Sequence, residues 1–205
     1  MGATCRIRGH GPLLPVVRLL AMIWITIGLA LVAAIVVLYN RLVRARNRVD
    51  TAWSDIDVQL QRRHDLVPRL VKAVDAYAKY EKATLEAVAE LRAEAMRQTG
   101  IRERGRAEEQ LGEGMHRLIA LAESYPDLKA NENFLKLQGE LVETENYLQF
   151  ARRYYNGSVR EYNTMTESVP SNIVAGIFSF GARSFFQKSS DDAASVPLVE
   201  FGSVE

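Results

Sequence analysis

The sequence predicts an all-α protein, in which an N-terminal transmembrane helix continues into an antiparallel four-helix bundle and a disordered C-terminal tail follows. Three observations predict this fold class. An uninterrupted apolar run lies near the N-terminus, apolar residues recur at intervals of three and four across most of the remaining chain, and no segment alternates in the manner of a strand. A chain of 205 residues, 48% of them hydrophobic, can form one domain with a core of moderate size beside the apolar segment.

The charge balance and the cysteine count exclude several classes of function. Lys and Arg number 26 against 25 Asp and Glu, which gives a net charge of +1. Because this charge produces no general field that would attract a polyanion, nucleic acid is not expected as a partner. The single cysteine, Cys5, provides neither an intramolecular disulfide nor a thiolate metal site.

Residues 1–18 are predicted to form a flexible leader, because they combine glycines, prolines and arginines. The leader does not fit the myristoylation pattern, since Arg6 stands where that pattern needs Ser or Thr. A start of translation at Met22, directly at the apolar run, remains an alternative.

Residues 19–39 are predicted to form the transmembrane helix. They supply 21 consecutive uncharged residues, which at about 1.5 Å per residue span roughly 32 Å and can cross a hydrocarbon core of about 30 Å. A cleaved signal peptide is the main rival, because Val32, Ala33 and Ala34 are small enough for a peptidase site. The apolar run continues past these residues without a break, and this favours an uncleaved anchor.

Arginines on either side of the span predict its orientation. Three precede it and four follow it: Arg6, Arg8 and Arg18, then Arg41, Arg44, Arg46 and Arg48. By the positive-inside tendency we expect a single-pass protein of the cell's cytoplasmic membrane, with the bundle in the cytoplasm and the N-terminus outside. The four arginines after the span are candidates for contact with anionic lipid headgroups.

The bundle is predicted to occupy residues 40–168. Its first helix carries an apolar stripe from Leu42 to Tyr77 that is interrupted at Arg63, and Pro68 predicts a kink. A second helix begins after residue 80 and stops at Gly100. The charged residues 99–105 are interpreted as a solvent loop.

The third and fourth helices are predicted to be joined by the sequence YPDLKANENF, residues 125–134. The third helix begins near Ala107, and Gly112 and Gly114 each weaken it by about 1 kcal/mol relative to Ala. Pro126 ends this helix, and Asn131 or Asn133 can cap the fourth. A competing cap one turn earlier would use Ser124 with Asp127, so the boundary stays open.

Beyond the bundle, two further segments are expected. Residues 169–186 form a short aromatic segment that we expect to pack on the bundle, with a second membrane contact as the alternative. Residues 187–205 lack periodicity and are predicted to be a disordered tail.

The sequence shows no motif for catalysis. His10, His64 and His116 lack metal-ligand spacing, and no phosphate-binding loop or nucleophile motif is present. We therefore expect no catalytic, cofactor-binding or metal-binding residues and no small-molecule substrate. His64 and Asp65 are interpreted as part of a solvated face. A hydrolase that uses these two residues or polar residues of the fourth helix is a minor alternative.

Six polar residues are candidates for contact with a protein partner. They are Asp127, Lys129 and Glu132 in the turn, and Asn146, Arg152 and Asn156 on the fourth helix. The fourth-helix residues could instead fix the register of the helices, because buried amides and guanidinium groups must be hydrogen-bonded. Thr144 at a core position and the flanking Asn163 belong to the same polar set.

Four motifs carry a resemblance to a known family. They are YNRLVRARNRVDTAWSDIDVQLQRRHDLVPRLVKAVDAYAKYE, YPDLKANENFLKLQGELVETEN, FARRYYNGSVREYN and VPSNIVAGIFSF, in this order. Together they resemble the LemA family of bacterial membrane proteins over about three quarters of the chain, from Met22 to near Phe186. The resemblance implies an N-terminal anchor and a soluble helical bundle, and it supplies no catalytic residues. The leader before Met22 is longer than the family pattern.

These inferences predict a membrane-anchored scaffold or adaptor that presents a helical bundle to unknown membrane-associated proteins, without catalytic activity or a cofactor. The alternative is a structural protein that organises or shapes the membrane through the arginines after the span.

Overall fold

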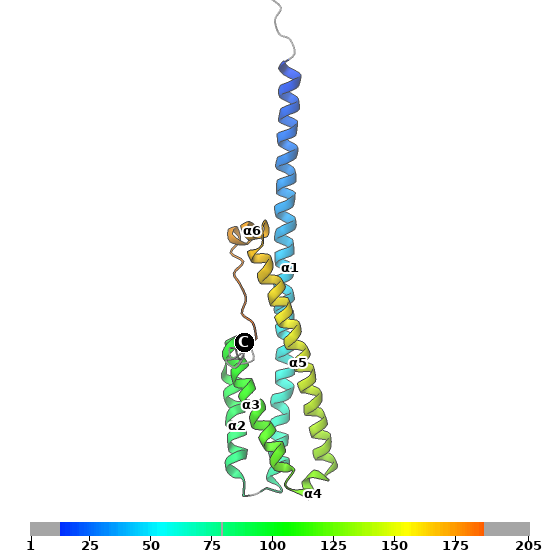
Figure 1. Ribbon diagram of the computed structural model, residues 1–205, viewed down its shortest axis with the longest axis vertical. Helices are drawn as coiled ribbons and strands as arrows, with labels where there is room; N and C mark the ends of the chain where they lie inside the picture. The colour runs from blue at the N-terminus through cyan, green and yellow to red at the C-terminus, as the bar shows by residue number, and fades with distance from the viewer. Residues whose placement is uncertain (1–12, 79, 187–205) are drawn as a thin grey trace, which may run out of the picture. The chain divides into compact units, whose positions relative to one another are not determined.

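The computed structural model describes residues 13–78 and 80–186, and within these ranges the regular structure is helical without a strand. The all-helical prediction is therefore confirmed for the part of the chain that the structure describes. The helices are α1 (Leu13–Asp75), α2 (Lys82–Arg97), α3 (Ile101–Ala122), α4 (Pro126–Lys129), α5 (Glu132–Glu167) and α6 (Ser171–Ile177) (Figure 1). The tail predicted over 187–205 and residues 1–12 of the leader lie outside the described residues. Helix α1 begins at Leu13, inside the segment predicted as the leader.

The chain divides into two compact units, and α1 and α5 contribute to both. The anchor unit contains the N-terminal part of α1 up to Arg44, together with residues 165–181. The core unit contains residues 45–164 and the segment that follows from Ala182.

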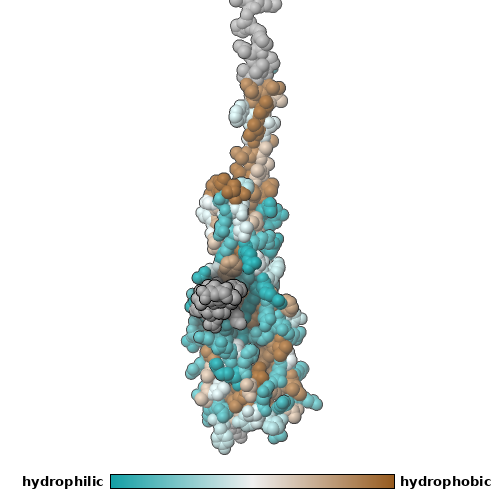
Figure 2. Space-filling model, viewed as in Figure 1, coloured by the Kyte–Doolittle hydropathy of each residue, from teal (hydrophilic) through white to brown (hydrophobic). Residues whose placement is uncertain are grey.

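In the anchor unit, α1 supplies one helix long and apolar enough to cross a membrane. Its large apolar side chains are exposed, as Trp24 at 71% and Leu29 at 70% illustrate, and they form a continuous hydrophobic surface (Figure 2). Thr26, the one aliphatic polar residue of the run, donates its hydroxyl to the carbonyl of Ile23 at 2.8 Å. The span therefore leaves no side-chain donor of Thr26 unpaired in an apolar environment.

Aromatic side chains fasten the C-terminal part of the anchor unit to α1. The ring of Tyr39 lies edge-on to Phe178 and Phe180, with centroid distances of 4.8 and 5.6 Å. Such edge-to-face pairs stabilise a contact beyond the area that they bury. The end of α6 is thus held against the last residue of the apolar run.

In the core unit, a single hydrophobic cluster takes residues from α1 to α5, and the long helices lie alongside one another (Figure 1). Its members follow the stripes predicted from the sequence, with Leu70 and Val74 on α1, Leu111 and Leu118 on α3 and Leu137 on α5 among them. Each of these side chains is at most 4% exposed. Burial of a side chain of this size contributes about 1.5 to 3 kcal/mol, so this cluster is the main source of stability.

The connector between α2 and α3 is shorter than the sequence predicted. The solvent loop predicted over 99–105 is wrong, because α3 already begins at Ile101 and the amide of Arg104 donates to the carbonyl of Gly100 at 2.8 Å. Arg and Glu are good helix formers, so the charges that suggested a loop also permit a helix. Arg104 in addition reaches Asp57 on α1 at 2.6 Å.

Helix α1 runs through Pro68 without ending there. Since proline lacks the amide hydrogen, the hydrogen bond to the carbonyl of His64 cannot form. That carbonyl has another partner, because the Nε of Arg92 on α2 donates to it at 2.8 Å. The side chain of Arg92 therefore satisfies an acceptor that the proline leaves open, and the kink predicted at this position stays a prediction.

Candidate functional site

Arg63, the residue that interrupts the apolar stripe of α1, lies inside the core unit and is 2% exposed. Its Nη1 is 3.5 Å from Oε2 of Glu108 on α3, and its Nε is 3.0 Å from Oε1 of Glu145 on α5. Neither contact has hydrogen-bond geometry, since Nε of Arg63 and both carboxylate oxygens lack a hydrogen-bond partner. The attraction is thus that of charges in close contact, and it links three helices.

His64 is buried beside Arg63, so its interpretation as part of a solvated face is wrong. Its Nε2 lies 2.7 Å from Oε1 of Glu108, which is completely buried. Positions 63, 64 and 67 all face the core. The buried face of α1 is therefore wider here than the two positions in every seven residues that a coiled-coil helix buries. Asp65 points to solvent as predicted and accepts a hydrogen bond from Gln61 at 3.0 Å.

Because His64 and Glu108 are both enclosed, the pair holds α1 to α3 and presents no proton donor or acceptor at the surface. A buried polar pair of this kind stabilises only if its members stay paired, since an unpaired buried charge is strongly destabilising. The minor alternative of a hydrolase that uses His64 and Asp65 therefore lacks its geometry, because the imidazole and the carboxylate of Asp65 face different surroundings.

Gly112 on α3 makes room for the guanidinium of Arg63. A Cβ at this position would lie 2.5 Å from Nη2 of Arg63, closer than side-chain carbons approach other atoms. The glycine that weakens α3 by propensity is thus required by the buried arginine of α1. Gly114 has a similar reason, since a Cβ there would lie 2.8 Å from Cδ1 of Leu91 on α2.

Arg152, predicted to contact a partner, lies at the border of this cluster. Burial lowers the pKa of its guanidinium, and the nearby charge of Arg63 lowers it further. Its guanidinium carbon lies 5.0 Å from the ring centroid of Phe186, over the ring. Arg152 is therefore covered by the chain's own C-terminal segment.

Asn156 and Asn163 on α5 hold that segment by its backbone. Asn163 donates to the carbonyl of Arg183 at 2.9 Å and accepts from the amide of Arg183 at 2.9 Å. Asn156 makes the same pair of bonds with Phe186, at 3.0 and 2.9 Å. The two asparagines are two helical turns apart and their peptide partners are three residues apart, which matches an extended segment that runs antiparallel to α5.

Aromatic and charged side chains complete this attachment. The ring of Phe186 lies 5.8 Å from Trp53 on α1, and Trp53 lies 5.6 Å from Tyr155 on α5. Tyr155 donates its hydroxyl to the carbonyl of Ser184 at 2.8 Å, and Arg183 reaches Asp50 at 3.2 Å. Burial raises the pKa of Tyr155. Tyr155, Asn156 and Asn163 of α5 therefore bind a segment of the same chain. This role differs from both interpretations of the sequence, which were contact with a partner and control of helix register.

The stretch 125–134 forms a helix stop, one turn of helix and a helix start. Helix α4 begins at Pro126 without a side-chain cap, and its residue Leu128 is buried. The side-chain oxygen of Asn131 accepts from the amides of Asn133 and Phe134 at 3.0 and 3.2 Å. Asn131 is thus the cap of α5, and the competing cap by Ser124 does not form.

The other turn candidates, Asp127, Lys129 and Glu132, have exposed side chains, as does Asn146 on α5. The four arginines after the span are also exposed. Arg44 donates to the carbonyl of Asn40 at 3.2 Å, and Arg48 pairs with Glu161 at 2.5 Å. Of these four headgroup candidates, Arg41 and Arg44 belong to the anchor unit.

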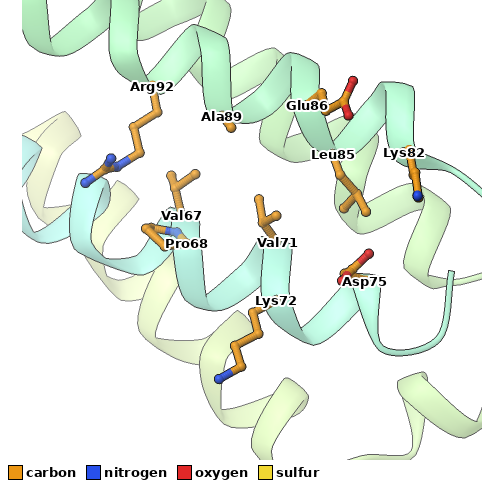
Figure 3. A pocket seen from close by; sticks show the side chains of 10 residues that line it. All are labelled: Val67, Pro68, Val71, Lys72, Asp75, Lys82, Leu85, Glu86, Ala89 and Arg92. Atoms are coloured by element: carbon orange, nitrogen blue, oxygen red, sulfur yellow. The ribbon is translucent and has the colours of Figure 1, made fainter. Parts of the chain in front are cut away.

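The core unit carries several open clefts. One, of about 630 Å³, lies between α1 and α2, with Val67, Val71 and Leu85 on its walls and Lys72 and Asp75 at its margins (Figure 3). Another, of about 330 Å³, is defined here as the α3–α5 groove. Its lining residues are Met115, His116, Ile119, Gln138, Leu141, Val142, Glu145 and Asn146. Among the described residues no group of three or more His, Cys, Asp or Glu could hold a metal ion.

Comparison with known proteins places these features in a family. The model of the LemA family matches residues 52–201, which include most of the core unit and residues 165–181 of the anchor unit. The chain belongs to the LemA family. This LemA-family chain is 25% identical to the magnetosome proteins MamQ 1 and MamQ 2 of Paramagnetospirillum magneticum over 222 residues, covering 96% of the chain and 79% of each relative. It is 23% identical to the magnetosome protein MamQ of Magnetospirillum gryphiswaldense, covering 93% and 78%.

Family membership and the one sufficiently long apolar helix found among residues 13–78 and 80–186 together support a single-pass membrane protein. Neither the LemA family nor these relatives are known as enzymes. The LemA resemblance stated from the sequence motifs is thereby confirmed, and the matched range includes the buried ion cluster and all of the C-terminal attachment except Asp50.

Sequence reasoning missed Glu108, because a glutamate next to an alanine on a charged helix carries no signal of burial. A signal for Arg63 was present, since it stands at a core position of an otherwise apolar stripe. The sequence also contained a signal for Asn156 and Asn163, because two amide side chains seven residues apart lie on one face of a helix.

Proposed function

We propose that this LemA-family protein is a membrane-anchored adaptor without catalytic activity, and that its core unit binds a membrane-associated protein partner at the α3–α5 groove. The observation that carries the proposal is a set of large apolar side chains left exposed on α5, one of which, Val142, lines that groove. Val142 and Phe150 are 62% and 61% exposed, and Leu135 is 50% exposed.

These side chains form one face. Leu135 and Val142 are seven residues apart, and Phe150 follows eight residues later, so at about 100° per residue the three lie within an arc of about 80° on α5. Val142 also lines the α3–α5 groove beside Met115 and Ile119. An apolar face that borders a groove is typical of a surface for another protein, because single scattered apolar residues need no explanation but a contiguous patch does.

The polar candidates divide between this surface and the rest of the molecule. Asn146 lines the groove and is exposed, so it can supply polar contacts at its edge. Arg152 and Asn156 are engaged by the chain's own residues and are not proposed as partner contacts. The turn residues Lys129 and Glu132 are exposed beyond the end of the groove and form a second candidate contact.

The test is capture of partners from solubilised membrane with three single variants of the full chain. Val142→Glu and Phe150→Glu place a charge on the proposed face, while Val58→Glu places one on an exposed apolar residue of α1 that is 52% exposed. We expect a protein captured stoichiometrically by the wild type and by Val58→Glu, and lost with the two α5 variants. Capture that survives both α5 variants contradicts the proposed surface.

A charge swap in the turn separates the second contact from the first. Lys129→Glu and Glu132→Lys leave the groove unchanged, so loss of capture with these variants assigns recognition to the turn. If capture persists with both, Asp127, Lys129 and Glu132 have no recognition role and the stretch is a turn only.

The second candidate function is organisation of the membrane itself. It is supported by the exposed arginines that follow the span and by relatives named as magnetosome proteins. Purified full-length protein in vesicles with anionic lipid distinguishes the two functions. Deformation of the vesicles without any added protein favours the organiser, and its absence together with specific capture favours the adaptor.

A further inference from the structure

We propose that the exposed apolar face of α6 lies on the lipid bilayer, so that the protein contacts the membrane at a second place beside its transmembrane helix. The partner of this surface is the interfacial layer of the same bilayer that holds the anchor. The proposal depends on the apolar span of α1 and is independent of the α3–α5 groove.

The depth of α6 follows from its contact with Tyr39. Tyr39 is the last residue of the apolar run that begins at Leu19, and a run of this length covers about 30 Å of hydrocarbon. Tyr39 therefore marks the boundary where aromatic side chains gather in membrane proteins. Because the ring of Phe178 is 4.8 Å from that of Tyr39, the end of α6 lies at the same depth.

The face that α6 leaves exposed is apolar. Ile173 and Ile177 are one helical turn apart and are 60% and 69% exposed, and Phe178 beside them is 49% exposed. The side of α6 that carries Val174 and Ala175 is occupied, since these residues are each 3% exposed. The exposed face is visible as a hydrophobic patch over α6 (Figure 2). At the boundary of a bilayer such a face is covered by lipid without any further protein.

The charge and the backbone of this segment also fit an interfacial position. Residues 169–178, VPSNIVAGIF, contain no charged side chain, so no ion has to leave water. The amides that follow α6 are paired within the segment, because Phe178 donates to Val174 at 3.0 Å and Phe180 donates to Ala175 at 2.9 Å. These two amides therefore keep their acceptors when the segment enters the interface.

Exposed Arg41 places a charged side chain next to the apolar surface of the span and α6. It follows Tyr39 by two residues, and Arg44 lies one turn further along α1. Cations at this distance from the boundary reach the phosphate layer. The apolar face of α6 thus matches the hydrocarbon boundary of the bilayer, and these arginines match its phosphate layer.

The test measures the depth of fluorescent probes in the full chain reconstituted into vesicles. Cys5→Ser removes the native thiol, and Ile173→Cys carries an environment-sensitive fluorophore. The matched control is Val142→Cys, because Val142 is 62% exposed and Ile173 is 60% exposed. Ile25→Cys, within the span, reports whether the anchor is inserted. Quenching is measured with lipids spin-labelled near the headgroup, with lipids labelled near the chain end, and with aqueous iodide.

We expect the probe at 173 to be quenched strongly by the lipid labelled near the headgroup and weakly by iodide, and the probe at 142 to show the reverse. The probe at 25 should be quenched most by the lipid labelled near its chain end. Strong iodide quenching at 173, with the probe at 25 still in the lipid, overturns the proposal and leaves the face of α6 for a protein partner. Absence of lipid quenching at 25 also overturns it, because the depth argument then loses its reference. A second labelled variant, Ile177→Cys, must give the same result as position 173.

Discussion

Replacement of Gly112 by alanine is expected to destabilise the protein, although alanine is the better helix former. The substitution gains about 1 kcal/mol of helix propensity. Against this, the new Cβ would lie 2.5 Å from Nη2 of Arg63, so the guanidinium must move. Its side chain is 3% exposed and in contact with Glu108 and Glu145, so there is no solvent into which it can swing.

The size of the effect follows from these contacts. Removal of one partner from a buried ion pair costs about 3 to 5 kcal/mol, and a displaced guanidinium loses part of that amount. With the gain in propensity subtracted, we expect the free energy of unfolding to fall by about 1 to 3 kcal/mol. If the buried contact were absent, the substitution would raise the free energy of unfolding. The sign of the change therefore tests whether Arg63 is held in place.

The assay is urea unfolding of the full chain in detergent, followed by circular dichroism. Gly139→Ala and Gly157→Ala on α5 are the matched controls, because a Cβ at either position meets no atom within 4 Å. These two variants should each gain about 0.4 to 1 kcal/mol. If Gly112→Ala is stabilising to the same extent as the controls, the arginine is not held in place and the account of the buried cluster is refuted.

Three further predictions follow from the turn, the C-terminal attachment and the span. Asn131→Ala should lower the free energy of unfolding by about 1 kcal/mol, because two amides lose their acceptor, whereas Asn133→Ala should change it by less than about 0.5 kcal/mol; equal effects would refute the assignment of the cap. Because burial raises the pKa of Tyr155, the folded state holds the phenolic proton more tightly than the unfolded state. The free energy of unfolding should therefore be constant with respect to this group below the ordinary tyrosine pKa of about 10 and should fall above it. Tyr155→Phe should reduce that fall, and an unchanged profile would contradict the prediction. A C-terminal alkaline phosphatase fusion should be inactive if the core unit faces the cytoplasm, and activity would reverse the predicted topology.

Much of the helical framework could be predicted because it depends on periodicity alone. The stripes of α3 and α5 required only that apolar residues recur at helical spacing, and Leu111 and Leu137 are buried as that spacing demands. The cap at Asn131 was one of two candidates, since a preference for asparagine at a helix start does not decide which of two nearby asparagines is used.

The features that the sequence could not supply depend on distant contacts. His64 is polar and stands beside Asp65, so its burial follows only from the position of Glu108 on another helix. Propensity also could not decide the start of α3, because Arg and Glu are compatible with both a solvated loop and a helix. Residues 169–186 were expected to pack on the bundle, but the backbone pairing of residues 183 and 186 with Asn163 and Asn156 was not predicted, because an extended segment carries no periodic signal.

The central claim, that the core unit binds a protein partner at the α3–α5 groove, is tested most directly by photo-crosslinking in intact cells. A photoreactive amino acid is placed at Val142 in the proposed surface or at Val58, which is exposed to a similar extent on α1. We expect one discrete protein adduct from position 142 that is absent from position 58 and is lost when Phe150→Glu is added. No adduct at 142, or the same adducts from both positions, would contradict it.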